Sequence, residues 1–124
     1  LMKPTLDACI RRAAAADGGQ DLIDEINQAC RQGRAFCIGS AQVRIVLRLR
    51  FRDGEPYVVV WLAASTLHDG VRRYIPLIQA MTRQVGGRWV EFATRRRGFL
   101  RLARRLGFEP LSEEEGFLRF KIPL

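Results

Sequence analysis

The sequence predicts a mixed α/β (α+β) domain with one mainly antiparallel central sheet and about four helices, in the order α-α-β-β-β-α-β-α-β-β. Three observations lead to this prediction. The first third of the chain repeats apolar residues at three- and four-residue steps, as amphipathic helices do. The middle changes to strict alternation and turns at Asp53-Gly54, which is typical of a β-hairpin. In the last third, helical stretches alternate with short strands, and a helix between neighbouring parallel strands forms a crossover.

Two short helices are expected before residue 34. The first begins after Thr5 and ends at Asp17, where Gly18-Gly19 follows. Asp21 is expected to cap the second helix, and Gly33 is expected to terminate it. Each helix carries one apolar stripe, so both should pack against a sheet.

The central strands follow from period-two alternation. Residues 35–39 predict a short strand, and residues 43–52 alternate aliphatic or aromatic residues with arginines. A turn at Asp53-Gly54 would place three pairs of residues opposite each other, and these are Arg50 and Tyr57, Arg48 and Val59, and Val46 and Trp61. Guanidinium groups would then lie beside aromatic rings. The return strand, residues 57–64, is apolar on both faces, which favours a central strand covered on each side.

The remaining elements are set by glycine and proline. A third helix runs to about Val85, and Pro76 is expected to delay its start until near Arg73. Residues 88–93 predict a strand, and residues 98–106 a helix that Gly107-Phe108 ends in a Schellman motif. Residues 108–111 and 117–122 can pair as a closing hairpin across an acidic turn at 112–116.

Length and composition indicate one globular domain over residues 1–124. The 124 residues are 48% hydrophobic and 27% charged, which is neither disordered nor membrane-embedded composition. The longest apolar run, residues 57–64, is too short for a membrane helix, and no secretory signal is visible. The net charge of +8 favours association with polyanions, among them nucleic acids and phosphate-bearing cofactors.

The cysteines predict a reducing environment. There are three of them with one histidine and no C-x-x-C pair, which argues against a disulfide framework and against a metal site. Cys9 and Cys30 fall on the apolar stripes of the expected helices, so buried, reduced thiols are expected. The sequence therefore predicts a cytoplasmic protein.

Three segments resemble the GNAT family of N-acetyltransferases over roughly residues 20–122, without the first strand of that fold. These segments are "GRAFCIG", "VVVWLAAS" and "LIQAMTRQVGGRWVEFATRRRGFLRLARRLGF". More narrowly, they are similar to small GNAT-like proteins of tailed bacteriophages and prophages. In those proteins a Gly-Arg-Arg-Gly-Trp-like segment precedes the last helix, and Arg96-Arg97-Gly98-Phe99 stands in that place here.

The resemblance implies an acetyl-CoA site and direct transfer of the acetyl group to an amine, with no metal. It implies that the cofactor contacts the end of the central strand, the loop after it and one later arginine: Leu62, Ala63, Ala64, Ser65, His68, Gly70, Val71, Arg72 and Arg96. His68 and Glu91 are the candidate catalytic residues, because each could act as an acid or a base. The acceptor amine is unknown.

Two departures from the family pattern weaken the implied activity. GNAT enzymes bind the pyrophosphate on an Arg/Gln-x-x-Gly-x-Gly/Ala loop, whose backbone N–H groups form an anion site. Only Gly70 of that loop remains, and Asp69 brings a negative charge that Arg72 and Arg73 could offset. Ala103 stands where many members have a proton-donating tyrosine, and Arg96 replaces an asparagine.

Other interpretations of the same residues stay open. Ala63 and Ala64 could simply end a buried strand, His68 could be a surface residue, and Glu91 a solvated carboxylate paired with an arginine. The arginines at 97, 101, 104 and 105 could form the solvated face of a helix or bind a polyanion. The alternative function is thus a catalytically inactive GNAT-fold binding or assembly module, a virion protein or a non-specific nucleic-acid partner.

One structural criterion separates the two functions. A cofactor cleft requires an open gap between the strand that ends at Ala64 and the strand that begins at Arg88. If Trp61, Trp89 or Tyr74 filled that gap, the enzyme interpretation would weaken.

Overall fold

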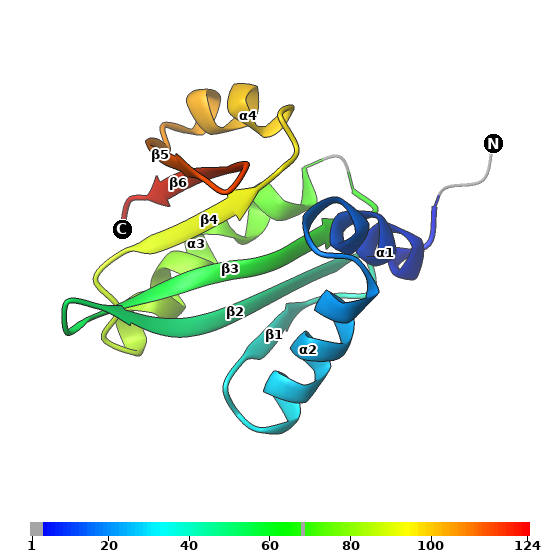
Figure 1. Ribbon diagram of the computed structural model, residues 1–124, viewed down its shortest axis with the longest axis horizontal. Coiled ribbons are helices and arrows are strands. Elements are labelled where there is room, and N and C mark those ends of the chain that lie inside the picture. Colours follow the sequence, from blue (N-terminus) through cyan, green and yellow to red (C-terminus); the bar gives the residue numbers. More distant parts are fainter. Residues whose placement is uncertain (1–3, 68) are drawn as a thin grey trace.

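The elements occur in the order predicted from the sequence. A computed structural model describes residues 4–67 and 69–124, and six strands of this part form one sheet in the order β1-β2-β3-β4-β6-β5 (Figure 1). The elements are α1 (Leu6–Asp17), α2 (Gln20–Arg31), β1 (Phe36–Gly39), β2 (Val43–Arg52), β3 (Glu55–Ser65), α3 (Gly70–Gln84), β4 (Val90–Thr94), α4 (Phe99–Leu106), β5 (Glu109–Glu114) and β6 (Phe117–Ile122).

The sheet is antiparallel except between β3 and β4, which α3 connects. These two strands pair over only three positions, from Val58 opposite Val90 to Val60 opposite Phe92. β3 continues to Ser65 and β4 to Thr94, but within the described residues no further pairs join them. The two strands therefore separate after Val60, and this splits one end of the sheet.

The β2–β3 hairpin has the turn that the sequence predicts. Asp53 and Gly54 both have positive φ, 51° and 79°, as a type I′ turn requires. Arg50 lies opposite Tyr57 and Arg48 opposite Val59, as expected. The expected pairing of Val46 with Trp61 is wrong, because a register shift after Val46 places that residue opposite Leu62. Trp61 is the extra residue of this β-bulge.

Helices cover the two faces of the sheet unequally. On one face, α3 and α4 pack through Ile78 and Ala103 against the larger core. On the other face, α1 and α2 bury a smaller core that includes Val46, Leu62 and Ala64. Figure 1 shows α1 and α2 over the β1–β3 side of the sheet, away from β5 and β6. Part of this face is thus left without a helix.

Two expected helix starts are wrong. Gly19, with φ of 76°, precedes α2, so Asp21 lies in the first turn and is not the N-cap. Its charge there still interacts favourably with the helix dipole. α3 begins at Gly70, with Pro76 inside it. Proline at this position leaves the Arg72 carbonyl without its usual helical donor, and packing of the helix on the sheet outweighs that loss.

The C-terminal elements agree with the prediction and extend it. The Phe108 N–H donates to the Ala103 carbonyl (2.9 Å) and Gly107 has φ of 74°, which confirms the Schellman motif. β5 continues to Glu114, so the expected acidic turn shortens to Glu115-Gly116.

The cysteine side chains are less buried than expected. All three thiols are free; Cys9 and Cys30 are only partly buried, and Cys37 is exposed. The sulfur atoms of Cys30 and Cys37 lie 3.6 Å apart, a contact between α2 and β1 that the sequence spacing does not reveal. Among the described residues there is no group of three or more His, Cys, Asp or Glu side chains that could hold a metal ion. None of the described helices is long and apolar enough to cross a membrane.

Candidate active site

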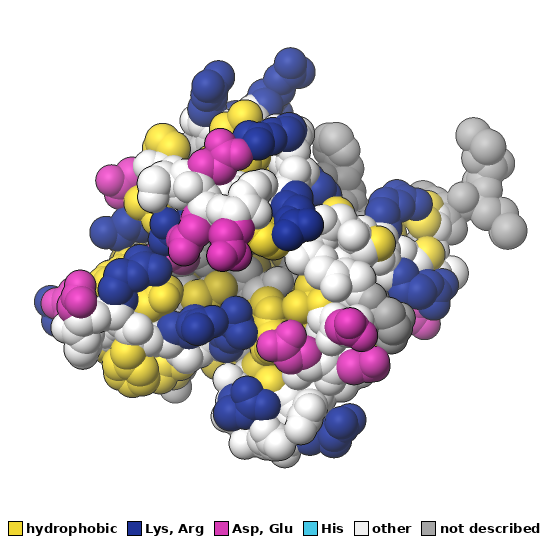
Figure 2. Space-filling view, in the orientation of Figure 1, with side chains coloured by type: hydrophobic (Ala, Val, Ile, Leu, Met, Phe, Trp, Pro, Cys, Tyr) yellow, Lys and Arg dark blue, Asp and Glu magenta, His cyan; other side chains and the backbone are white. Residues whose placement is uncertain are grey.

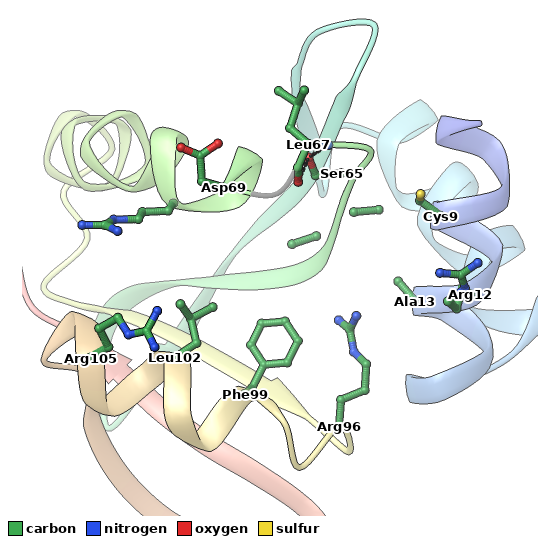
Figure 3. Close-up of a pocket in the computed structure, with 13 residues that line it drawn as sticks. Cys9, Arg12, Ala13, Ser65, Leu67, Asp69, Arg96, Phe99, Leu102 and Arg105 are labelled. Atoms are coloured by element: carbon green, nitrogen blue, oxygen red, sulfur yellow. Dashed lines mark hydrogen bonds between the residues drawn. The ribbon is translucent and has the colours of Figure 1, made fainter. Parts of the chain in front are cut away.

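A cavity of about 320 Å³ lies at the end of β3, where β4 has separated from it. Figure 3 shows side chains entering this main cavity from α1, from the segment after β3 and from α4. Its lining residues come from α1, β3, α3, α4 and the segments before α3 and α4: Cys9, Arg12, Ala13, Ala63, Ala64, Ser65, Leu67, Asp69, Arg72, Arg96, Phe99, Leu102 and Arg105. The split in the sheet creates the space, and helices on both sides close it.

The segment between β3 and α3 is held by Ser65. The Leu67 N–H donates to the Ser65 hydroxyl oxygen (2.8 Å), and this hydroxyl donates back to the Leu67 carbonyl (3.1 Å). A Cβ at Gly70 would lie 2.0 Å from the same hydroxyl oxygen, so only glycine fits there. Gly70 therefore fixes the start of α3 against the end of β3.

The charge of the main cavity is positive. Four arginines line it against one carboxylate, that of Asp69. The Asp69 carboxylate also pairs with Arg73, at 3.2 Å from its Nε, so part of its charge is offset. A cavity with this excess of guanidinium groups favours an anionic ligand, and phosphates above all.

Arg96 is the arginine with the most contacts in this cavity. Its guanidinium lies 4.6 Å from the centre of the Phe99 ring and 3.8 Å from the Asp17 carboxylate. Asp17 also accepts hydrogen bonds from the Arg95 N–H (2.8 Å) and the Thr94 hydroxyl (3.2 Å). The end of α1 is thereby tied to the end of β4, which sets the width of the split.

The three aromatic residues that could have filled the split do not line the main cavity. Trp89 stacks on Tyr57 at 5.0 Å, and Tyr74 packs against the larger core. The Trp61 ring lies under the Arg48 guanidinium, and 3.9 Å separates the ring centre from the guanidinium carbon. Trp61 does border a narrow gap between β3 and β4, which has no room for a water molecule. The main cavity beyond that gap is open.

The fold has well-aligned neighbours among solved structures. A Bacillus subtilis acetyltransferase in complex with CoA aligns with 100% of this chain and 96% of its own, with a TM-score of 0.63 and 18% identity. AtaTR bound with acetyl-CoA aligns with 92% of this chain and 84% of its own, with a TM-score of 0.61 and 16% identity. The fold is GNAT-like.

A third structure agrees with this assignment. It is a tyrosine-to-phenylalanine mutant of the AtaT toxin bound to acetyl-CoA and to the C-terminus of the antitoxin AtaR. It covers 98% of this chain and 89% of its own, with a TM-score of 0.51 and 18% identity. No protein-family model and no curated protein sequence matches the chain. At such identities the likeness confirms the predicted GNAT fold and no more.

In this GNAT-like fold the main cavity brings together five of the residues expected to bind the cofactor, namely Ala63, Ala64, Ser65, Arg72 and Arg96. Two do not line it. Leu62 points into the core under α1 and α2, and Gly70 packs against Ser65. His68 lies outside the described residues, and so does the side chain of Val71.

Glu91 belongs to a different place. Its side chain is 8% exposed and accepts hydrogen bonds from Arg52 (2.5 Å), Arg119 (3.0 Å) and the Trp89 indole (2.7 Å). Burial alone would raise the pKa of Glu91, but these three donors outweigh it and hold the pKa below the usual value. A carboxylate held in this way is a poor proton acceptor. The geometry therefore gives no support to Glu91 as a general base. The expected pairing with an arginine is confirmed, but the carboxylate is buried and not solvated.

Glu91→Gln is expected to destabilise the fold by about 1–3 kcal/mol at neutral pH, because Arg52 and Arg119 lose a charged partner. Since the pKa of Glu91 is lower in the folded chain than in the unfolded one, its contribution is complete above the unfolded value and is lost as the pH falls through the folded value. The difference in unfolding free energy between wild type and variant should therefore shrink below about pH 4. Urea unfolding at several pH values measures it.

The matched control for Glu91→Gln is Glu113→Gln. Glu113 pairs with Arg97, but the two side chains are 49% and 60% exposed. An exposed pair of this kind contributes about 0–1 kcal/mol. Equal losses in both variants would show that the Glu91 cluster does not stabilise the sheet.

The parts of the cavity that α1 and α4 supply were not expected from the sequence. Phe99, Leu102 and Arg105 of α4 all line it, whereas the sequence suggested a solvated face or a polyanion contact for Arg105. Their spacing of three residues places them on one helix face, and this spacing can be seen in the sequence. Arg12 and Cys9 carry no comparable signal, because only the tertiary packing of α1 brings them to β3.

Proposed function

We propose that the chain binds acetyl-CoA in the main cavity and transfers the acetyl group to an amine. The observation that carries the proposal is an arginine-lined cavity at the point where β3 and β4 separate. The solved neighbours, which are bound to CoA or acetyl-CoA, support it.

The end of β3 fits the arm of the cofactor. Beyond Val60, no described residue of β4 pairs with β3, so that edge of the strand has backbone groups without a strand partner. Ala63 and Ala64 have small side chains and lie in the cavity wall. An arm with amide groups can bond to such an edge much as a neighbouring strand does.

The phosphates would be held by side chains more than by a glycine loop. Arg12, Arg72 and Arg105 reach the cavity from three different helices. Gly70 packs closely against Ser65. The backbone N–H groups at the start of α3 would add to the positive charge that the arginines supply. Arginine side chains thus offset the degenerate loop.

The reaction needs no nucleophilic side chain. The amine nitrogen bonds to the acetyl carbon, the carbon–sulfur bond breaks, and the proton released from the amine is taken up by the departing CoA sulfur. The chain binds and orients the two substrates, and Phe99 and Leu102 give the cavity part of an apolar wall.

A melting-temperature titration tests cofactor binding. Acetyl-CoA at about 100 times its dissociation constant should stabilise the fold by about 2.7 kcal/mol. Salt-matched ATP and a DNA oligomer are the controls, because a chain of charge +8 binds polyanions non-specifically. An equal shift with all three ligands would refute a specific acetyl-CoA site.

A second candidate is a GNAT-fold module that binds but does not catalyse. The observation in its favour is Ala103, which is 3% exposed and cannot protonate a departing thiolate. Release of free CoA thiol in the presence of a panel of amines separates the two candidates. A binding module would show the melting shift without thiol release.

A further inference from the structure

Arg48 forms no ion pair with a carboxylate in the part of the chain that the structure describes. It lies on β2, on the face of the sheet that carries α1 and α2, with its guanidinium stacked on Trp61. Within residues 4–67 and 69–124 its Nε–H is buried and has no hydrogen-bond acceptor. Burial lowers the pKa of Arg48, and the neighbouring Arg50 lowers it further. A stacked, partly desolvated guanidinium of this kind binds an incoming carboxylate strongly.

Beside Arg48 lies a second cavity, of about 220 Å³, at the edge of α1 and α2 on the same face of the sheet. Figure 2 shows hydrophobic side chains exposed in a hollow near the centre of this face, with charged side chains of both signs around it. This second cavity is lined by Asp17, Leu22, Arg48, Val59, Val60, Trp61, Ala93 and Phe117. By the volume of liquid water it holds about seven water molecules, which is the size of a small organic molecule.

The second cavity adjoins the main cavity through the narrow gap between β3 and β4. The gap shares Asp17, Leu22, Trp61 and Ala93 with the second cavity. It shares Ala13, Ala63 and Arg96 with the main cavity. The two cavities therefore lie on either side of the gap between β3 and β4, which has no room for a water molecule and must widen before an acceptor can reach the cofactor.

We propose that the second cavity binds the acceptor, and that the acceptor is a small amine that carries a carboxylate, such as a free amino acid. The inference rests on the proposed function. The carboxylate pairs with Arg48, and the apolar part packs on Leu22 and Phe117. The amine then lies on the side of Asp17, next to the gap that leads to the main cavity.

The same residues disfavour a polyanion in this cavity. Asp17 is part of its wall, and Glu25 is near enough to raise the pKa of Arg48. Successive phosphates would meet these carboxylates, whereas a molecule with one carboxylate and one neutral amine can place the carboxylate at Arg48 and donate a hydrogen bond from the amine to Asp17. The small volume also admits one compact molecule and not an extended chain.

Thiol release from acetyl-CoA tests the proposal with two matched pools, the standard L-amino acids and their carboxamides. The acids are expected to react with a kcat/KM at least tenfold above that of the amides. Arg48→Ala should lower kcat/KM for the acids by roughly 10- to 100-fold, the loss of one charge-assisted bond. Arg48→Lys should recover part of that loss, because it keeps the charge but not the planar geometry.

Arg50→Ala is the control, since Arg50 is the exposed arginine two positions along the same strand and does not line the cavity. It should react like wild type. The melting shift with acetyl-CoA should be the same in all variants, so a lost shift would count against the proposed function and not against the acceptor site. Equal rates with acids and amides, no reaction with either pool while acetyl-CoA still binds, or equal losses in Arg48→Ala and Arg50→Ala would overturn the proposal.

Discussion

Replacing Arg72 and Arg105 together by alanine is expected to weaken acetyl-CoA binding by roughly a hundredfold or more. Both side chains line the main cavity, one from the first turn of α3 and one from α4. Each charge-assisted hydrogen bond to a phosphate is worth about 1.5–3 kcal/mol, and about 1.4 kcal/mol corresponds to a factor of ten in the dissociation constant. Titration calorimetry at fixed salt measures the change.

Arg83→Ala with Arg104→Ala is the matched control for this variant. These residues belong to the same two helices and are exposed, but they do not line the main cavity. Both double variants lower the net charge equally, so a non-specific polyanion effect would weaken binding in both to the same extent. Loss confined to the Arg72/Arg105 variant supports a specific phosphate site, and equal loss would contradict it.

The fold could be predicted because its local signals agree with each other. The Asp53-Gly54 turn, the alternation of residues 43–52 and the Gly107-Phe108 stop each have a short-range cause, and all three are found in the structure. The order of the ten elements followed from such signals. The bulge at Val46 did not, because the extra residue on β3 depends on packing under α1 and α2.

The site was harder to predict than the fold. The resemblance to GNAT proteins pointed to the end of β3, to Arg72 and to Arg96, and all of these line the main cavity. The burial of Glu91 could not be predicted, because its partners Arg52 and Arg119 lie on two other strands. No residue near Glu91 in the sequence indicates this pairing. The alternation of residues 43–52 predicted guanidinium groups beside aromatic rings, and Arg48 does stack on Trp61. Only the tertiary structure shows that its Nε–H is buried without an acceptor among the described residues. The bacteriophage origin and the cytoplasmic location stay predictions.

Ala93→Phe is expected to separate cofactor binding from transfer. Ala93 borders the narrow gap and the second cavity but not the main cavity. The gap has no room for a water molecule as it stands, so the amine reaches the thioester only if the gap widens, and a phenyl ring there would prevent this. Misplacement of a substrate by about 1 Å can cost a hundredfold in rate, so thiol release with any amine should fall by at least about that factor. The melting shift with acetyl-CoA should remain.

Ala93→Ser supplies the control, because serine adds one atom and leaves the gap as it is. The aromatic variant should also fold, since Ala93 is only partly buried and β-strands favour aromatic residues. Wild-type transfer in Ala93→Phe would mean that the acceptor does not approach between β3 and β4, and the acceptor site at Arg48 would then have to be abandoned. If the variant loses acetyl-CoA binding as well, the main cavity and the gap form one site, and the split in the sheet serves the cofactor alone.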